Sequence, residues 1–151
     1  MSSELRDLYQ ELILDHTKRP RNHRRIEGAT HMKAGVNPLC GDSLVLYLEV
    51  VDGVVRDVSF EGSGCAISKS SASMLTERVK GSTLAETEVL FGRFHHMLTE
   101  GEPTEADEEL LGKLAVFRGV REFPARVKCA TLSWQTLHAA LAGQQAPVST
   151  E

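Results

Sequence analysis

The sequence has little of what marks several large classes of protein. It contains only three cysteines, an odd number that fits poorly with a framework of paired disulfides. Aromatic residues make up 5% of the chain, and no apolar run is long enough to cross a membrane. The N-terminus is polar and lacks the apolar core of a secretory signal. We therefore expect a soluble cytoplasmic protein with no role at a membrane.

A basic excess is also missing. The 17 Lys and Arg residues are outnumbered by 21 Asp and Glu, which gives a net charge of −4. General nucleic-acid binders carry the opposite balance, so we expect no nucleic-acid partner. The length of 151 residues suits one domain with a buried core, which we expect to span residues 1–151. Residues 143–151 have the composition of a disordered tail.

Helical and strand patterns follow one another in a simple order. A helix that Ser2 or Ser3 can cap presents Leu5, Leu8, Tyr9, Leu12 and Ile13 on one face. Strict alternation predicts strands over 43–51 and 54–61, joined by an Asp52-Gly53 turn, with 31–36 as a candidate edge strand. Helices are expected over 68–80, 83–98 and 103–117 and finally through 124–142. The order predicts an α+β fold: a small antiparallel sheet of two to three strands packed with about five helices.

A run of five Lys and Arg residues in eight positions follows the first helix, over residues 18–25. Charge runs of this kind most often form solvated loops. The alternative is a basic surface that docks an acidic partner.

The cysteines all fall at expected junctions between elements. Cys40 lies with Asp42 on the turn Asn37-Pro38-Leu39-Cys40-Gly41-Asp42, which opens into a strand. Cys65 follows a strand and precedes a helix, whose first amides favour a thiolate. Cys129 is expected near the start of the last helix, beside Arg126 and Lys128, whose charges favour its thiolate. Three thiols and one carboxylate form a suitable ligand set for a soft or borderline metal.

Other interpretations of these residues are weaker. A single free cysteine is more often a small buried apolar residue than a ligand, and the spacing of the three matches no zinc-finger rule. Gly62-Ser63-Gly64 has Ile67 where a dinucleotide fingerprint needs its third glycine, and Ser43 lacks the turn of a hydrolase nucleophile. For a Cys–His hydrolase, His95, His96 and His138 are the histidines to weigh, and we expect them on helix surfaces or in structural roles.

Four stretches together resemble the SufU branch of the IscU/NifU-like iron–sulfur cluster assembly family. They are Asp15-His16 through Pro20-Arg21-Asn22, Asn37 to Asp42, Gly62 to Ser68, and Arg126 to Ala130. The resemblance covers about residues 5–142. Two departures from IscU-type scaffolds favour the SufU branch: Lys128 stands where they have a histidine, and the chain has an additional helical segment around residues 92–117. The motif by which IscU recruits a chaperone is replaced by Phe123-Pro124-Ala125-Arg126.

The resemblance implies a metal site made of Cys40, Asp42, Cys65 and Cys129, with zinc as the usual occupant. It also implies a pyridoxal-phosphate-dependent cysteine desulfurase of the SufS type as partner, with downstream Suf assembly proteins as recipients. By the same analogy, Cys40 accepts persulfide sulfur after a desulfurase residue displaces it from the metal. Asp42 would be the exchangeable ligand, and Arg126 and Lys128 would steady the thiolates or the transferred sulfur.

Three functions therefore stay open at the level of the sequence. The first is a zinc-bound sulfur acceptor with sulfurtransferase activity alongside a desulfurase. The second is a non-enzymatic scaffold that holds iron or assembles a transient [2Fe–2S] cluster on Cys40, Cys65 and Cys129. The third is a structural zinc-binding adaptor domain.

Overall fold

The computed structural model describes residues 3–143 and 147–150 and has the predicted α+β architecture. The elements in chain order are α1 (Ser3–Lys18), β1 (His31–Asn37), β2 (Asp42–Val51), β3 (Val54–Ser63), α2 (Ala66–Val79), α3 (Leu84–Thr99), α4 (Glu105–Leu111), the 3-10 helix η1 (Gly112–Glu122), α5 (Pro124–Ala142) and β4 (Val148–Ser149). Five α-helices accompany the sheet within the described residues, as the sequence predicts.

The sheet has one strand more than predicted, in the order β3-β2-β1-β4. β1, β2 and β3 are antiparallel neighbours, whereas β4 is parallel to β1 and pairs Val148 with Gly35. The sheet is therefore mixed, and the prediction of disorder after residue 143 is wrong for residues 148–149. Residues 144–146 and 151, which belong to the same predicted tail, lie outside the described residues.

A β-bulge in the β2–β3 hairpin breaks the predicted alternation of β3. The register shifts between Glu49 and Val50, so that Val50 faces Val55 while Glu49 faces Asp57. The extra residue reverses the inward side of β3, which buries Val55 before the bulge and Val58 after it. A period-two reading of the sequence cannot detect this change.

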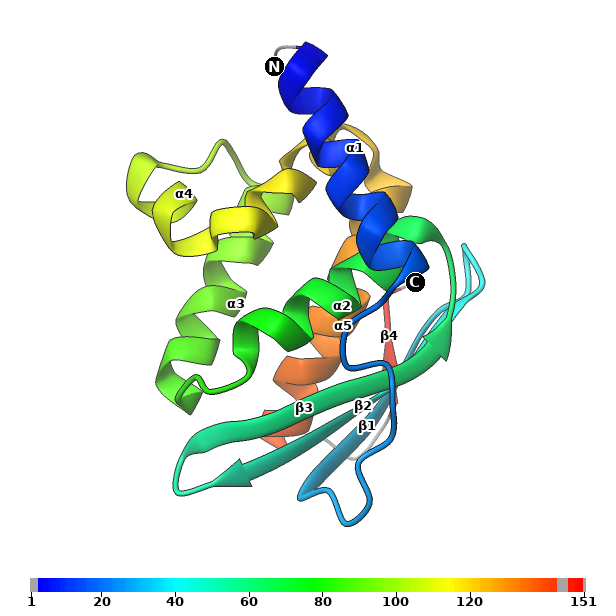
Figure 1. The fold of residues 1–151 in the computed structure, drawn as a ribbon, viewed down its shortest axis with the longest axis vertical. Helices are drawn as coiled ribbons and strands as arrows, with labels where there is room; N and C mark the ends of the chain where they lie inside the picture. The colour runs from blue at the N-terminus through cyan, green and yellow to red at the C-terminus, as the bar shows by residue number, and fades with distance from the viewer. Residues whose placement is uncertain (1–2, 144–146, 151) are drawn as a thin grey trace.

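The helices gather on one face of the sheet (Figure 1). α2 packs on β3, while α5 crosses β1 and β2 and also packs against α2. The close approach of α5 explains Gly35, because a Cβ there would collide with the Thr136 hydroxyl. Trp134 of α5 is fully buried and stacks on Phe94 of α3, with 4.5 Å between ring centroids. Together these contacts form one core and fix β1 against α5.

Two helix predictions need correction. The helix expected over 103–117 is divided into α4 and η1, because Gly112 adopts a φ of +54° that an α-helix cannot continue through. α2 begins two residues earlier than expected, since Cys65 caps it. By contrast, the predicted capping box of Thr83 and Glu86 is confirmed at the start of α3.

The N-terminal region also follows the predicted pattern. Tyr9, Leu12 and Ile13 pack against the core, whereas the side chains of Leu5 and Leu8 lie outside the described residues. Across the part of the chain that the structure describes, no helix combines the length and the hydropathy that a membrane span requires.

The basic segment after α1 is a folded strap along the edge of β3. The Phe60 amide donates to the Asn22 carbonyl at 3.1 Å, and His23 forms a bridge with Phe60. The segment is therefore a largely exposed loop, as the first interpretation predicts, and its arginines are paired with the chain's own carboxylates. Its use as a docking surface stays a prediction. Each of its four arginines lies within 4 Å of a carboxylate, namely Arg19, Arg21, Arg24 and Arg25.

Candidate metal and sulfur site

The site begins at the turn between β1 and β2. Asn37 and Asp42 face each other as the last pair of the antiparallel ladder, and the chain reverses between them. Gly41 has a φ of +72°, a left-handed value that glycine adopts without strain. Cys40 lies on this turn and is exposed. The local sequence thus presents one thiol to solvent at the open end of the sheet.

Asp42 points inward and forms hydrogen bonds with two separate segments, the end of β1 and the start of α2. Its side chain is buried, with 2% of the residue exposed. Oδ1 accepts a hydrogen bond from the Cys65 amide at 2.8 Å, and Oδ2 accepts one from Asn37 Nδ2 at 3.1 Å. Gly64 makes room for this arrangement, because a Cβ there would lie 2.5 Å from Asp42 Oδ1. The carboxylate is therefore held in place by the chain around it.

Cys65 lies between a strand and a helix, as the sequence predicts, and it is the residue that caps the N-terminus of α2. Its Sγ accepts a hydrogen bond from the Ser68 amide at 3.4 Å and lies 4.0 Å from Asp42 Oδ2. An amide donor and the positive end of the helix dipole both favour a negative sulfur at this position. Cys65 is half-buried, so its thiol is less open to solvent than that of Cys40.

Cys129 lies in the second turn of α5. The residue is 2% exposed, and its Sγ lies 3.6 Å from the Ala125 carbonyl and 3.4 Å from Asn37 Nδ2. Burial raises the pKa of the Cys129 thiol, and its contacts with Cys40, Asp42 and Cys65 raise it further. Neither Arg126 nor Lys128 is among the main causes of this pKa shift, so the help of these cations to the Cys129 thiolate stays a prediction.

The two predicted cations do not contact the cysteines. Arg126 is exposed, and its guanidinium lies 5.4 Å above the Phe123 ring. Lys128 is half-buried, and its backbone carbonyl accepts a hydrogen bond from the Thr150 hydroxyl at 3.2 Å. Both flank Cys129 on α5, but no contact of their charged groups with a thiol supports a role.

The donor atoms converge from four separate elements. One ligand atom each of Cys40, Asp42 and Cys129 lies within 4.8 Å of the others, and Cys65 adjoins the set through Asp42. Two thiolates bound to one tetrahedral zinc, with bonds of about 2.3 Å, lie roughly 4 Å apart. The separations and the mixture of sulfur with one carboxylate therefore fit a zinc ion. No other group of three or more Cys, His, Asp or Glu converges in this way among the described residues.

Sequence reasoning assigns no role to Asn37, although it begins the motif. Its side chain is fully buried, and its amide group contacts both Asp42 and Cys129. Inward positions of β1 alternate as Lys33, Gly35 and Asn37. The inward position of Asn37 could be recognised only once the register of β1 was known, because the sequence predicts a strand over residues 31–36 only weakly.

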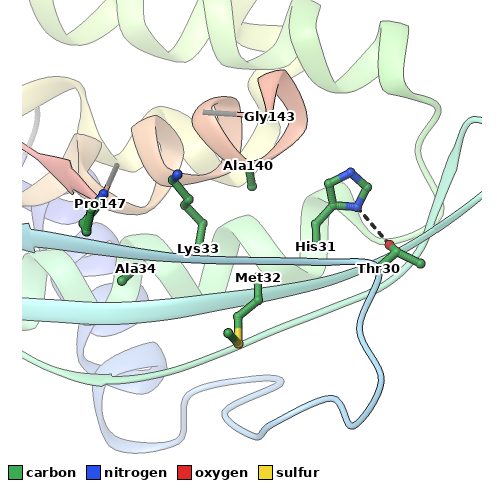
Figure 2. A pocket seen from close by; sticks show the side chains of 8 residues that line it. All are labelled: Thr30, His31, Met32, Lys33, Ala34, Ala140, Gly143 and Pro147. Carbon is green, nitrogen blue, oxygen red and sulfur yellow. Dashed lines mark hydrogen bonds between the residues drawn. The ribbon is translucent and has the colours of Figure 1, made fainter. Parts of the chain in front are cut away.

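Other polar groups lie away from the cysteines. Figure 2 shows a pocket of about 360 Å³ between β1 and the end of α5, where Lys33 points toward the helix and Met32 points away from it. It contains no cysteine or carboxylate among its lining residues. On α3, His96 bonds Glu100 at 2.7 Å, and His138 of α5 stacks on Phe91, as expected for surface and structural histidines.

Comparison with known protein families matches residues 8–142 to the model of the NifU-like N-terminal domain. The chain belongs to this family. The resemblance seen in the four sequence stretches is thereby confirmed, and the match spans every residue of the cysteine site.

Individual relatives of this NifU-like chain carry two kinds of description. It is 37% identical over 145 residues to the zinc-dependent sulfurtransferase SufU of Bacillus subtilis, which covers 95% of this chain and 96% of the relative. It is 40% identical over 134 residues to the iron–sulfur cluster assembly scaffold protein IscU of Thermotoga maritima, covering 89% and 92%. Sequence identity therefore places the chain near both kinds.

Solved structures show the same fold. A crystal structure from Fervidobacterium islandicum, assigned as an iron–sulfur cluster assembly scaffold of the SUF system, superposes with a TM-score of 0.82 at 36% identity. It covers 93% of this chain and 99% of that one. A NifU-like N-terminal protein from Brucella abortus gives a TM-score of 0.78 at 25% identity, covering 95% and 100%. The arrangement of sheet and helices is that of the NifU-like fold.

Proposed function

We propose that this protein accepts persulfide sulfur from a cysteine desulfurase and holds zinc between transfers. Cys40, Asp42, Cys65 and Cys129 would bind the ion. The description of the Bacillus subtilis relative as a zinc-dependent sulfurtransferase supports this reading. The pairing of soft sulfur donors with one oxygen donor supports it independently, because zinc accepts both.

The observation that carries the proposal is the unequal exposure of the donors. Cys129 and Asp42 are 2% exposed, whereas Cys40 is exposed on its turn. A purely structural site needs all of its ligands to stay on the metal and has no use for one that another protein can reach. Here Cys40 has the most exposed thiol of the three, since Cys65 is half-buried and Cys129 is buried, so Cys40 is the proposed acceptor.

The transfer itself is a thiol exchange. The Cys40 thiolate attacks the terminal sulfur of the desulfurase persulfide, the sulfur–sulfur bond breaks, and the desulfurase cysteine leaves as a thiolate. A bound zinc ion supplies the positive charge that keeps the site cysteines deprotonated. The Ser68 amide donates a hydrogen bond to the Cys65 sulfur, which would stabilise negative charge on this ligand. Arg126 and Lys128 are proposed to steady the thiolates or the transferred sulfur from α5.

Partners follow from this chemistry. A pyridoxal-phosphate-dependent cysteine desulfurase of the SufS type would supply the sulfur, and downstream Suf assembly proteins would receive it. The exposed Leu39 beside Cys40 and the exposed Phe123 before α5 give apolar surface at this end of the molecule.

The test is Cys40→Ser, which changes one atom. The protein is incubated with a cysteine desulfurase and cysteine, and mass spectrometry locates the added sulfur. We expect the wild type to gain one sulfur at Cys40 and to stimulate the desulfurase, and Cys40→Ser to do neither. Sulfur found on Cys65, or full stimulation by the variant, would sink the proposal. Metal analysis of the purified wild type should give roughly one zinc per chain, since the site offers four ligands.

A scaffold that assembles a [2Fe–2S] cluster as its product is the second candidate. It is favoured by the 40% identity to the Thermotoga maritima scaffold protein. Lys128 weakens it, since IscU-type scaffolds carry a histidine there. Anaerobic reconstitution with iron and sulfide separates the two: a stable, transferable cluster supports the scaffold, whereas tight zinc with sulfur transfer and no cluster supports the acceptor.

A structural zinc adaptor is the remaining alternative. It predicts that Asp42→Ala abolishes folding. The acceptor predicts a folded protein with altered transfer, destabilised by about 1–3 kcal/mol because two donors lose their acceptor.

A further inference from the structure

Asn37 is a buried polar side chain that the proposed transfer does not use. It is 0% exposed and stands at the end of β1, directly opposite Asp42 in the ladder. Its Nδ2 lies 3.1 Å from Asp42 Oδ2 and 3.4 Å from Cys129 Sγ. One amide group thus contacts two prospective metal ligands that come from β2 and α5.

The orientation of this amide is set by its neighbours. An ionised carboxylate only accepts hydrogen bonds, so the NH₂ group must face Asp42 rather than the carbonyl oxygen. The two amide hydrogens are enough for one bond to Asp42 and one to Cys129. Both bonds strengthen when the acceptors carry negative charge, as they do when they bind a metal.

This orientation leaves Asn37 Oδ1 buried with no partner among the described residues. A buried polar atom without a hydrogen bond lowers the stability of the fold by about 1–3 kcal/mol, which is more than one ordinary hydrogen bond adds to it. The fold accepts this loss of stability at Asn37, whose amide group bonds to both Asp42 and Cys129. Ser59 and Ser133 also have unpartnered buried hydroxyls, but neither donates to a cysteine or to Asp42.

The packing of β1 makes the contact rigid. Gly35 lets the strand approach Thr136 and Leu132 of α5, and Asn37 is the next inward residue. The asparagine therefore reaches α5 at the level of Cys129. A side chain held in this way can fix the distance between Asp42 and Cys129 before any ion arrives.

We propose that Asn37 is a positioning residue for the metal centre, which orients the Asp42 carboxylate and the Cys129 sulfur as a pair and partly withdraws charge from that sulfur. The proposal rests on the proposed zinc-bound function. Removing partners that orient metal ligands typically lowers metal affinity by about 10–100-fold. The same loss is expected here.

The test uses Asn37→Leu, which keeps the number and branching of the side-chain heavy atoms, and Asn37→Ala. Ser59→Ala is the matched control, because it removes another buried strand side chain with an unpartnered atom. Zinc affinity is measured by competition with a chelator, and Co²⁺ is bound as a spectroscopic probe.

We expect both Asn37 variants to bind Zn²⁺ and Co²⁺ about 10–100-fold more weakly. We also expect their thiolate-to-cobalt charge-transfer band to move to lower energy, because the Cys129 sulfur loses a hydrogen-bond donor. Ser59→Ala should match the wild type in both.

Each other result has a definite meaning. Wild-type affinity and an unshifted cobalt band in both variants would overturn the role of Asn37 and leave the proposed function intact. Failure of both variants to fold without metal would show that Asn37 is structural, which also overturns it. If the wild type itself bound neither ion, the proposed function would fail instead.

Discussion

Two polar clusters in this molecule are built from equally distinctive motifs, yet they differ in how completely their groups are paired. The first is the cysteine site: Cys40, Asp42, Cys65, Cys129 and Asn37. The second, the α1–α2 cluster, consists of Asp15, His16, Arg21, Asn22, Ser73 and Thr76. In the α1–α2 cluster, Asp15 bonds Arg21 at 2.6 Å, and Ser73 Oγ bonds both the Arg21 amide at 2.8 Å and His16 Nδ1 at 2.7 Å. The cysteine site keeps an exposed thiol and an unpartnered carbonyl oxygen.

The difference separates a structural motif from a reactive one. Asn22 Nδ2 also finds Thr76 at 3.1 Å, so the α1–α2 cluster joins α1, the basic strap and α2 through satisfied hydrogen bonds. A fully satisfied cluster stabilises the fold and has little left with which to bind a ligand. Unused donors and acceptors at the cysteine site are what a metal or a sulfur donor would engage. Changes in the two clusters should therefore affect different measurements.

The largest expected effect comes from Gly64→Ala, which alters no ligand. The new Cβ would lie 2.5 Å from Asp42 Oδ1, so the carboxylate must move away from its bond with the Cys65 amide. We expect zinc affinity to fall by at least about 10-fold, as for other changes that reorient a ligand. Chelator competition measures it. Gly92→Ala is the control, since a Cβ there meets nothing within 4 Å. Equal affinities in the two variants would show that Asp42 does not need its present position.

Ser73→Ala should produce the opposite pattern. It removes the hydroxyl that serves both His16 and the Arg21 amide, and it leaves those groups without a partner in a buried place. We expect the free energy of unfolding of the metal-free protein to fall by about 1–3 kcal/mol, with zinc affinity unchanged. Urea unfolding and chelator competition give the two values. A loss of zinc affinity comparable to that of Gly64→Ala would mean that the clusters are coupled and the comparison is false.

Much of the fold could be predicted from the sequence because the local patterns agreed with one another. The Asp52-Gly53 turn, the Thr83 capping box and the spacing of Ala130, Trp134 and Leu137 all appear as predicted. The misses depended on contacts between distant segments. β4 exists only because Val148 and Ser149 lie beside β1, and the bulge at Glu49 and Val50 has no local marker.

The site shows the same division. The motif residues identified which thiols and which carboxylate to consider, and the structure brings Cys40, Asp42 and Cys129 together. Sequence could not show that Cys129 is buried or that Asn37 reaches it, because both depend on how closely β1 packs on α5. Nor could it show that the basic strap is matched by carboxylates such as Asp15 and Asp57.

The smallest expected effect is a pH dependence that belongs to the α1–α2 cluster. Burial lowers the pKa of His16, and the nearby charge of Arg21 adds to this, while Glu77 and Asp15 oppose it and Lys113 acts weakly in the same direction as Arg21. The hydrogen bonds agree, since Ser73 Oγ accepts from the Arg21 amide and so donates to a neutral His16 Nδ1. The unfolded chain takes up a proton near pH 6.5, whereas the folded chain resists it. The contribution of His16 to the free energy of unfolding is therefore complete above pH 6.5 and falls as the pH drops below that value, by at most about 1.4 kcal/mol at pH 5.5 for one histidine.

Urea unfolding of the metal-free protein at pH 7.5 and 5.5 measures this loss. Both values lie above the range in which the lowered pKa values of Asp15 and Asp57 matter. His16→Gln should remove this part of the loss, and His96→Gln on the surface of α3 should not. If the wild type and His16→Gln lost equal stability, His16 would not be held neutral, and the α1–α2 cluster would be less completely satisfied than its geometry indicates.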